Sequence, residues 1–270
     1  MCCFKPNPID VFGTKIFASR RVYARQILVY SMSVSTNDDD LAMILPVPVP
    51  LAASEDSVKF INLEDYPTFF DDLQALFPAK KILKKSLGGG GGGSGGGETL
   101  VVHNVGDFVA SFVPGMRDFE RLDERFRIDP DIWLTQQQYA NYGFVVFQLK
   151  RPAQEPTKES GLLSGQRRRH IKLKPHPMAF EFPLREIGQR LFFPTVHIHD
   201  GTMPAKADFD HVLYAQTNGV GLRELAHWEE SKKLIKSKIN MQKASHLVLA
   251  DSHCYRRELQ GELPNLDTWL

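Results

Sequence analysis

Short segments rich in β-branched and aromatic residues, separated by turn-forming residues, are the feature that most constrains the fold of this chain. The main ones cover residues 14–18, 26–34, 41–49, 58–63, 99–103, 108–113, 142–149, 178–182, 190–199 and 208–216. Segments of this length, bounded by Gly, Pro, Asn and Asp, are typical of strands joined in hairpins. We therefore predict an α+β fold that consists mostly of antiparallel β-sheet with a few inserted helices.

Four segments are predicted to be helical. They cover residues 66–77, 116–126, 130–141 and 222–241. In the first, Phe69, Phe70, Leu73 and Phe77 recur at helical spacing, which indicates one buried face. The last has acidic residues first and basic residues last, an order that suits the helix dipole. Because the helices do not alternate strictly with the strands, the pattern does not favour a doubly wound sheet.

A glycine run divides the chain. Between Gly88 and Gly97 only Ser94 is not glycine. A flexible coil of this length has a root-mean-square reach of about 17–19 Å. We predict an N-terminal β-rich piece over residues 1–87, a flexible linker over 88–97 and a C-terminal α+β piece over 98–270. The two pieces are expected to form one joint fold, because neither set of strands looks self-sufficient.

The charge balance excludes some partners. The 270 residues include 33 basic and 32 acidic side chains, a formal net charge of +1. No global field of the kind that holds nucleic acid is therefore expected. No apolar run approaches the roughly 20 residues that span a bilayer, and Lys5 and Pro6 interrupt any signal-peptide core. The sequence predicts a soluble, cytoplasmic protein without a nucleic-acid or membrane partner.

Familiar catalytic motifs do not occur. The sequence contains no GxGxxG, no phosphate-binding Gly-Lys-Ser/Thr, and no HExxH, CxxC or GxSxG. A nucleotide-dependent enzyme and a hydrolase of the nucleophile-elbow type are therefore not favoured.

The segment from Phe192 to Gly201 holds the best candidate for a chemical site. It carries His197, His199 and Asp200 in a His-x-His-Asp pattern, with His211 ten residues further on. On a strand, residues two apart share one face, and neutral imidazoles bind Zn, Cu, Fe and Ni. The pattern predicts a metal- or thiol-based site for a divalent transition metal such as Zn. Paired polar histidines on the exposed face of a hairpin are the alternative.

The chain has three cysteines, Cys2, Cys3 and Cys254, too few for a disulfide framework. If Met1 is removed, Cys2 has a free amine beside its thiol, the arrangement of N-terminal-nucleophile hydrolases. A catalytic Cys2 is thus a second hypothesis, and an inert Cys2-Cys3 pair is its alternative. Convergence of these cysteines with His197, His199 and His211 would instead predict a soft-metal site.

The early cysteines, the strand that follows and the segment from Asp40 to Pro48, which reads DLAMILPVP, resemble the opening of a bacterial domain family of unknown function. Members of that family carry a cysteine near the mature start and an LPVP-like segment. The resemblance covers about the first 50 residues and implies a β-rich start without a mechanism. A third hypothesis, a non-catalytic interaction protein, predicts an exposed apolar patch near residues 46–50.

Overall fold

The computed structural model describes residues 3–5, 10–21, 24–36, 41–78, 102–124, 127, 136–150, 171–186, 188–198, 202–217, 224–244 and 246–270. The glycine run, the polar stretch at 151–170 and most of the helix predicted at 130–141 lie outside these residues. So do Cys2, His199 and Asp200.

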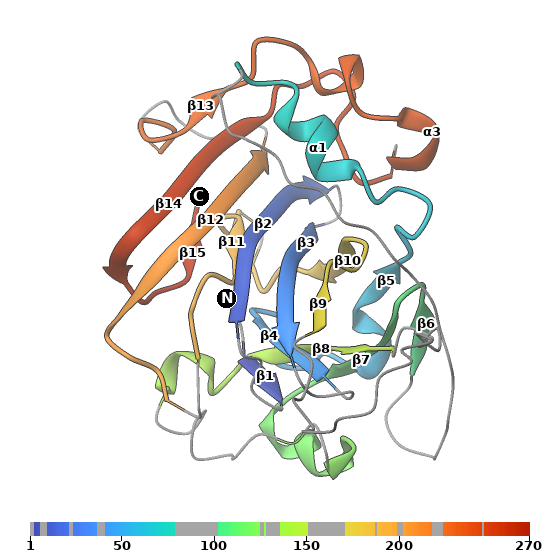
Figure 1. The fold of residues 1–270 in the computed structure, drawn as a ribbon. Coiled ribbons are helices and arrows are strands. Elements are labelled where there is room, and N and C mark those ends of the chain that lie inside the picture. Colours follow the sequence, from blue (N-terminus) through green and yellow to red (C-terminus); the bar gives the residue numbers. More distant parts are fainter. Residues whose placement is uncertain are drawn as a thin grey trace, which may run out of the picture.

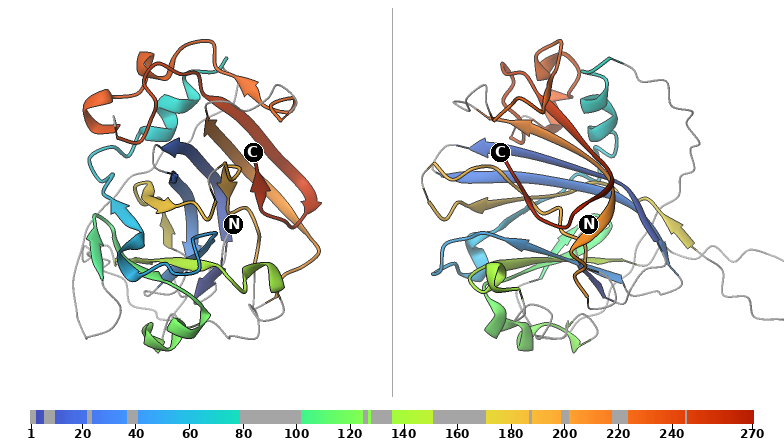
Figure 2. Two further views of the ribbon diagram at one scale, coloured as in Figure 1. Left: turned by 180° about the vertical axis from the view of Figure 1, so that it is seen from behind. Right: turned by 90° about the vertical axis from the view of Figure 1, so that its left-hand side faces the viewer.

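Two β-sheets face each other across the main core, as the right-hand view of Figure 2 shows. The smaller sheet has five strands in the order β1 (Cys3–Lys5), β4 (Leu41–Val47), β8 (Gly143–Leu149), β7 (Phe108–Val113) and β6 (His103–Val105). All of its neighbouring strands are antiparallel. Strands from both sides of the glycine run therefore belong to one sheet, where β4 from before the run pairs with β8 from after it.

The larger sheet has eight strands. Its order is β13 (Glu229–Glu230), β14 (Tyr255–Pro264), β12 (Lys206–Gln216), β2 (Asp10–Arg21), β3 (Arg25–Thr36), β10 (Met178–Pro183) and β5 (Lys59–Ile61), with β9 (Ile171–Leu173) also paired with β3. Only β12 and β2 run parallel to each other. Figure 1 shows β14 at one side of this sheet, beside β12. A third, two-stranded sheet joins β11 (Phe192–Phe193) to β15 (Thr268–Trp269).

Three apolar clusters occupy three layers. The first fills the space between the sheets, with Phe147 from one sheet and Phe180 from the other at 5.9 Å between ring centroids. The second lies on the outer face of the larger sheet, under helix α1 (Phe69–Gln74) and the segment around Ile235. The third lies on the outer face of the smaller sheet, against Phe119 and Tyr139. Strand β3 is thus buried on both faces over Gln26–Tyr30, as its apolar sequence predicts.

The helical predictions are partly wrong. The first is confirmed as the short α1, which buries Phe69, Phe70 and Leu73. The segment at 116–126 begins instead with a 3-10 helix over Met116–Arg121. The polar helix predicted at 222–241 does not form in its described part, which contains β13, a 3-10 helix at Ile235–Ser237 and α3 (Met241–Ala244). Its apolar residues are too sparse to form the continuous stripe that a surface helix buries.

One strand prediction is confirmed in its bounds only in part, and another needs correction. Strand β4 (expected within 41–49) ends at Val47 and includes Pro46, which lies opposite Phe144. The proline is tolerated because β1 pairs only with Ala42–Ile44, so Pro46 has a strand neighbour on one side only. The strand predicted at 190–199 is limited to Phe192–Phe193 and a single bridge at Ile198.

The structure also contradicts the prediction of an exposed apolar patch at residues 46–50. Val47 and Val49 are buried in the core between the sheets, and Leu51, 77% exposed, is the large apolar side chain that reaches solvent there. Among the described residues, every helix is too short or too polar to cross a lipid bilayer.

Candidate functional site

His197 and His211 lie side by side in the interior. His211 is on β12, His197 is in the connection after β11, and their ring centroids are 5.0 Å apart. The ring of Phe209 packs against both imidazoles, at 4.4 Å from His197 and 5.2 Å from His211. The exposed fractions are 5% for His197 and 1% for His211, so these histidines are not on a wet hairpin face.

An amide side chain holds the backbone at His197. The Asn265 Oδ1 accepts the His197 N–H at 2.7 Å, and its Nδ2 donates to the His197 carbonyl at 2.7 Å and to the Pro204 carbonyl at 2.9 Å. Asn265 is 2% exposed, so it replaces water for three backbone groups. The position of His197 therefore depends on a side chain 68 residues away rather than on a strand ladder.

Burial, and to a smaller extent the neighbouring His197, lower the pKa of His211 well below its usual range. The imidazole of His211 is therefore neutral, the form that binds metals. Within the described residues, however, no three His, Cys, Asp or Glu side chains lie close enough together to hold a metal ion. The pair supplies two nitrogen atoms, and the other two predicted ligands, His199 and Asp200, lie outside the described residues.

The carboxylate of Asp267 holds the connection that leads to His197. Asp267 accepts a hydrogen bond from the Tyr139 hydroxyl at 2.6 Å and from the backbone N–H groups of Thr195 and Val196 at 3.0 and 3.1 Å. Burial raises the pKa of Asp267 to about 6. The contact joins the start of β15 to the connection that carries His197.

This contact makes stability depend on pH. Because the pKa of Asp267 is higher in the folded chain than its ordinary 3.8, the folded state gains stability as pH falls from above 6 towards 4. A shift of about two units corresponds to at most about 3 kcal/mol, and partial exposure reduces it to roughly 1–2 kcal/mol. Asp267→Asn keeps the acceptor of Thr195 and Val196, so we expect it to remove this dependence. Urea unfolding of the natural protein and of Asp267→Asn between pH 4.5 and 7.5 measures the free energy of unfolding of each. If the two free energies differed by the same amount at every pH, the expectation would be contradicted.

Cys254 does not lie near the His197–His211 pair. Cys254 is fully buried in the cluster on the outer face of the larger sheet, whereas His211 faces the space between the sheets with Phe209. Burial raises the pKa of the Cys254 thiol, so that thiol is unreactive. Cys3 lies in the three-residue strand β1.

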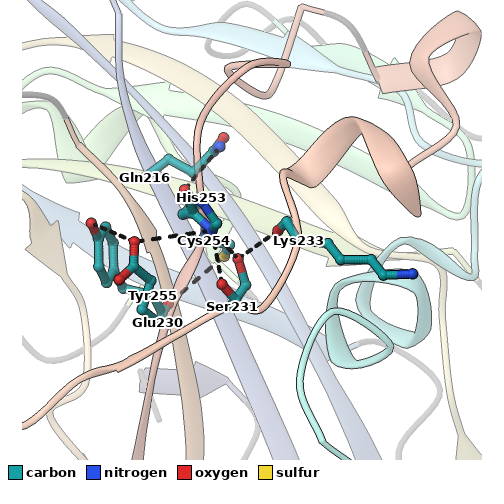
Figure 3. A network of polar contacts seen from close by, with 7 residues as sticks. All are labelled: Gln216, Glu230, Ser231, Lys233, His253, Cys254 and Tyr255. Atoms are coloured by element: carbon teal, nitrogen blue, oxygen red, sulfur yellow. Dashed lines mark hydrogen bonds and ion pairs between the residues drawn. The ribbon is translucent and has the colours of Figure 1, made fainter.

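A serine, a histidine and a glutamate lie together where β13 meets β14 (Figure 3). His253 presents the same nitrogen, Nδ1, to the Ser231 hydroxyl at 3.3 Å and to the Glu230 carboxylate at 4.0 Å. A catalytic triad needs the two ring nitrogens to face different partners. The Ser231 hydroxyl also donates to the Lys233 carbonyl and accepts the Cys254 N–H. The cluster therefore attaches β13 to β14 and is not a nucleophile site.

The outer side of β14 is open along most of its length. Strand β13 pairs with it only at Tyr255 and Arg256, and no other strand of the described residues lies on that side. Both backbone groups of Cys254 face Ser231. Since alternate residues of an antiparallel strand turn their backbone groups to the same side, those of Gln260 face away from β12.

The sequence analysis missed this strand edge. The segment from Tyr255 to Pro264 reads YRRELQGELP, and its charges hide the alternation of Tyr255, Leu259 and Leu263. Charged residues are common on edge strands, so the charge was itself a usable signal.

No protein-family model matches the chain, and neither does any curated protein. The resemblance to a bacterial family of unknown function therefore stays an expectation. Among solved structures, the chain is similar to baculovirus P35, with 12% identity, a TM-score of 0.47 and coverage of 100% of this chain and 98% of that chain. It is also similar to a mutated baculovirus P35 after caspase cleavage (15% identity, TM-score 0.42, 98% of each chain). A caspase-8/P35 complex matches with 12% identity, a TM-score of 0.40 and coverage of 95% and 94%.

Proposed function

We propose that this protein is a non-catalytic interaction protein that binds an extended polypeptide segment along the outer side of β14. The observation that carries the proposal is the ten-residue strand at the side of the larger sheet, whose outer side has a strand neighbour only at Tyr255 and Arg256. An exposed strand edge is a template for β-augmentation, in which main-chain hydrogen bonds supply the affinity. A cytoplasmic location, expected from the sequence, is part of the same proposal.

The interior groups support a binding role over a catalytic one. The Cys254 thiol is buried, and the Ser231 hydroxyl is engaged by two backbone groups. The edge of β14, in contrast, is accessible, and Glu258, Gln260 and Glu262 are all exposed. This accessible edge is thus a backbone surface without a reactive group.

Gln260→Pro tests this proposal, because proline removes the N–H that faces the open side of β14. The probe is a labelled eight-residue peptide that alternates valine with threonine. We expect saturable binding to the natural protein, measured by fluorescence anisotropy, and about tenfold weaker binding to Gln260→Pro. Gln260→Val is the matched control, since it changes the same side chain and keeps the N–H.

Hydrogen exchange provides a second measurement that does not rely on a variant. The bound peptide is expected to slow exchange of the Gln260 amide and to leave the α1 amides unchanged. Absence of binding by this peptide and by charged peptides of the same pattern would reject the proposal.

A metal site at His197 and His211 is a second candidate function. It is favoured by the buried imidazole pair at 5.0 Å and by the neutral state of His211. We expect the native mass to exceed the denatured mass by one metal ion, and His211→Ala to remove the excess. His253→Ala is the control, because that imidazole lies elsewhere. Equal native and denatured masses for the natural protein would exclude this candidate.

The Cys2 hypothesis concerns a residue outside the described ones and stays a prediction. If Cys2 is a nucleophile, the denatured mass should lack Met1, and Cys2→Ala should abolish labelling by a thiol electrophile. Retention of Met1 in the purified protein would rule the hypothesis out.

A further inference from the structure

The outer face of the β12–β14 ribbon is acidic. The register pairs Asp208 with Glu262 and Asp210 with Gln260, so these four side chains share one face. Glu258, two residues before Gln260, lies on the same face. The alternate residues, among them Phe209, Leu213 and Leu259, point the other way into the core between the sheets.

Acidic residues outnumber lysines on this face of the ribbon. On the ribbon itself, Lys206 pairs with Glu262 at 2.9 Å between Nζ and Oε1. On the neighbouring strand β2, Lys15 lies 3.8 Å from Asp71 of α1. The ribbon thus has one lysine on this face beside Asp208, Asp210 and Glu262, and Asp210 is 45% exposed beside its contact with the Gly13 N–H.

The acidic region is limited to one end of the ribbon. At the other end the same face carries Tyr214 and Arg256, and both are buried beneath Phe77. Arg256 is also paired with Glu229, so it does not compensate the exposed carboxylates. The exposed charge thus lies along the part of β14 that β13 leaves open.

We propose that the β14 edge binds an extended segment that carries lysine or arginine at alternate positions. The inference rests on the proposed function and names the chemistry of its partner. A strand added to β14 lies about 4.8 Å from it and about 10 Å from β12. Lysine and arginine side chains on the acidic face of such a strand reach Glu258 and Glu262 directly and extend towards Asp208. The other face of the added strand continues the apolar layer that contains Leu259.

Three labelled peptides of equal length test the inference. In each, valine alternates with lysine, threonine or glutamate. At low salt we expect the lysine peptide to bind about tenfold more tightly than the threonine peptide, and the glutamate peptide to bind most weakly. The difference between the lysine and threonine peptides should nearly vanish at about 1 M salt, where screening acts within a few ångströms.

The double variant Asp208→Asn with Glu262→Gln is expected to weaken lysine-peptide binding about five- to tenfold and to leave the threonine peptide unchanged. The matched control is Glu64→Gln with Asp65→Asn, which makes the same charge change at exposed positions before α1. If the control variant weakened lysine-peptide binding as much as the Asp208 and Glu262 variant does, the effect would come from net charge alone. That result would overturn the inference.

The outcomes separate the inference from the proposed function. If the lysine and threonine peptides bind equally and both are lost in Gln260→Pro, strand addition stands and the basic partner is wrong. If the lysine peptide binds Gln260→Pro as well as the natural protein, the contact does not use the strand edge and both proposals fail. Binding by no peptide also rejects both.

Discussion

Replacing Gly106 with alanine is expected to lower the free energy of unfolding by about 3 kcal/mol and the melting temperature by about 10 °C. Gly106 is in the two-residue turn between β6 and β7 and has a φ of +56°, where a Cβ is strained. A Cβ there would also lie 2.2 Å from the His176 Nε2. The replacement therefore combines backbone strain with a steric clash.

The clash cannot be relieved by a small rotation of the imidazole. His176 is 5% exposed, its Nε2 accepts the Asp107 N–H at 2.9 Å and its Nδ1 donates to the Pro177 carbonyl at 2.9 Å. The ring also packs edge-on against Phe108, with 5.1 Å between centroids. Movement of the ring would thus break both hydrogen bonds.

Gly13→Ala is the matched control for Gly106→Ala. Gly13 has a similar φ of +65°, but nothing lies within 4 Å of the Cβ that alanine would add. We expect it to cost only the backbone strain, about 1 kcal/mol. Urea unfolding measures the loss of stability in both glycine variants. In the double variant Gly106→Ala with His176→Ala, the part of the Gly106→Ala loss that comes from the steric clash should be absent. Equal losses for the two glycine variants would show that the His176 ring yields.

Asn265→Ala is expected to destabilise the protein by about 3–5 kcal/mol. The change removes the hydrogen-bond partners of three backbone groups, two at His197 and one at Pro204. A buried polar group without a partner costs about 1–3 kcal/mol, and the site is only 2% exposed. We also expect the His197 ring to lose its fixed position next to His211.

Thermal melting and the NMR signals of the His197 and His211 rings check this expectation. Asn62→Ala is the control, because Asn62 is exposed and accepts one backbone N–H, from Glu64 at 2.9 Å. It should cost less than about 1 kcal/mol. If Asn265→Ala were no worse than Asn62→Ala, water would be replacing the lost amide at His197.

Much of the local structure follows from the sequence. Strand β7 matches the segment expected at 108–113, and β10 extends the segment expected at 178–182 by one residue. Trp269 in β15 packs on Phe192 of β11, with 4.8 Å between their ring centroids. These elements are short apolar segments between turn residues, so their strand character is a local property.

The candidate site was less predictable. His197 was expected on a strand, yet β11 ends at Phe193 and Asn265 holds the backbone beyond it. The contact between His197 and His211 depends on how two distant segments pack, which the spacing of histidines does not report. The open edge of β14 was missed because a charged strand has a weak hydrophobic alternation.

The sequence by itself determined where most of the apolar strands lie, which residues are apolar enough to fill the cores and where many of the turns occur. Alternation and turn residues act over a few positions, and that range is sufficient for those features. Only the tertiary structure decided that β12 lies parallel to β2, that Asp267 binds the Thr195 and Val196 amides, and that one side of β14 stays open. Each of these depends on contacts between segments far apart in the chain, whose formation is governed by the packing of whole sheets.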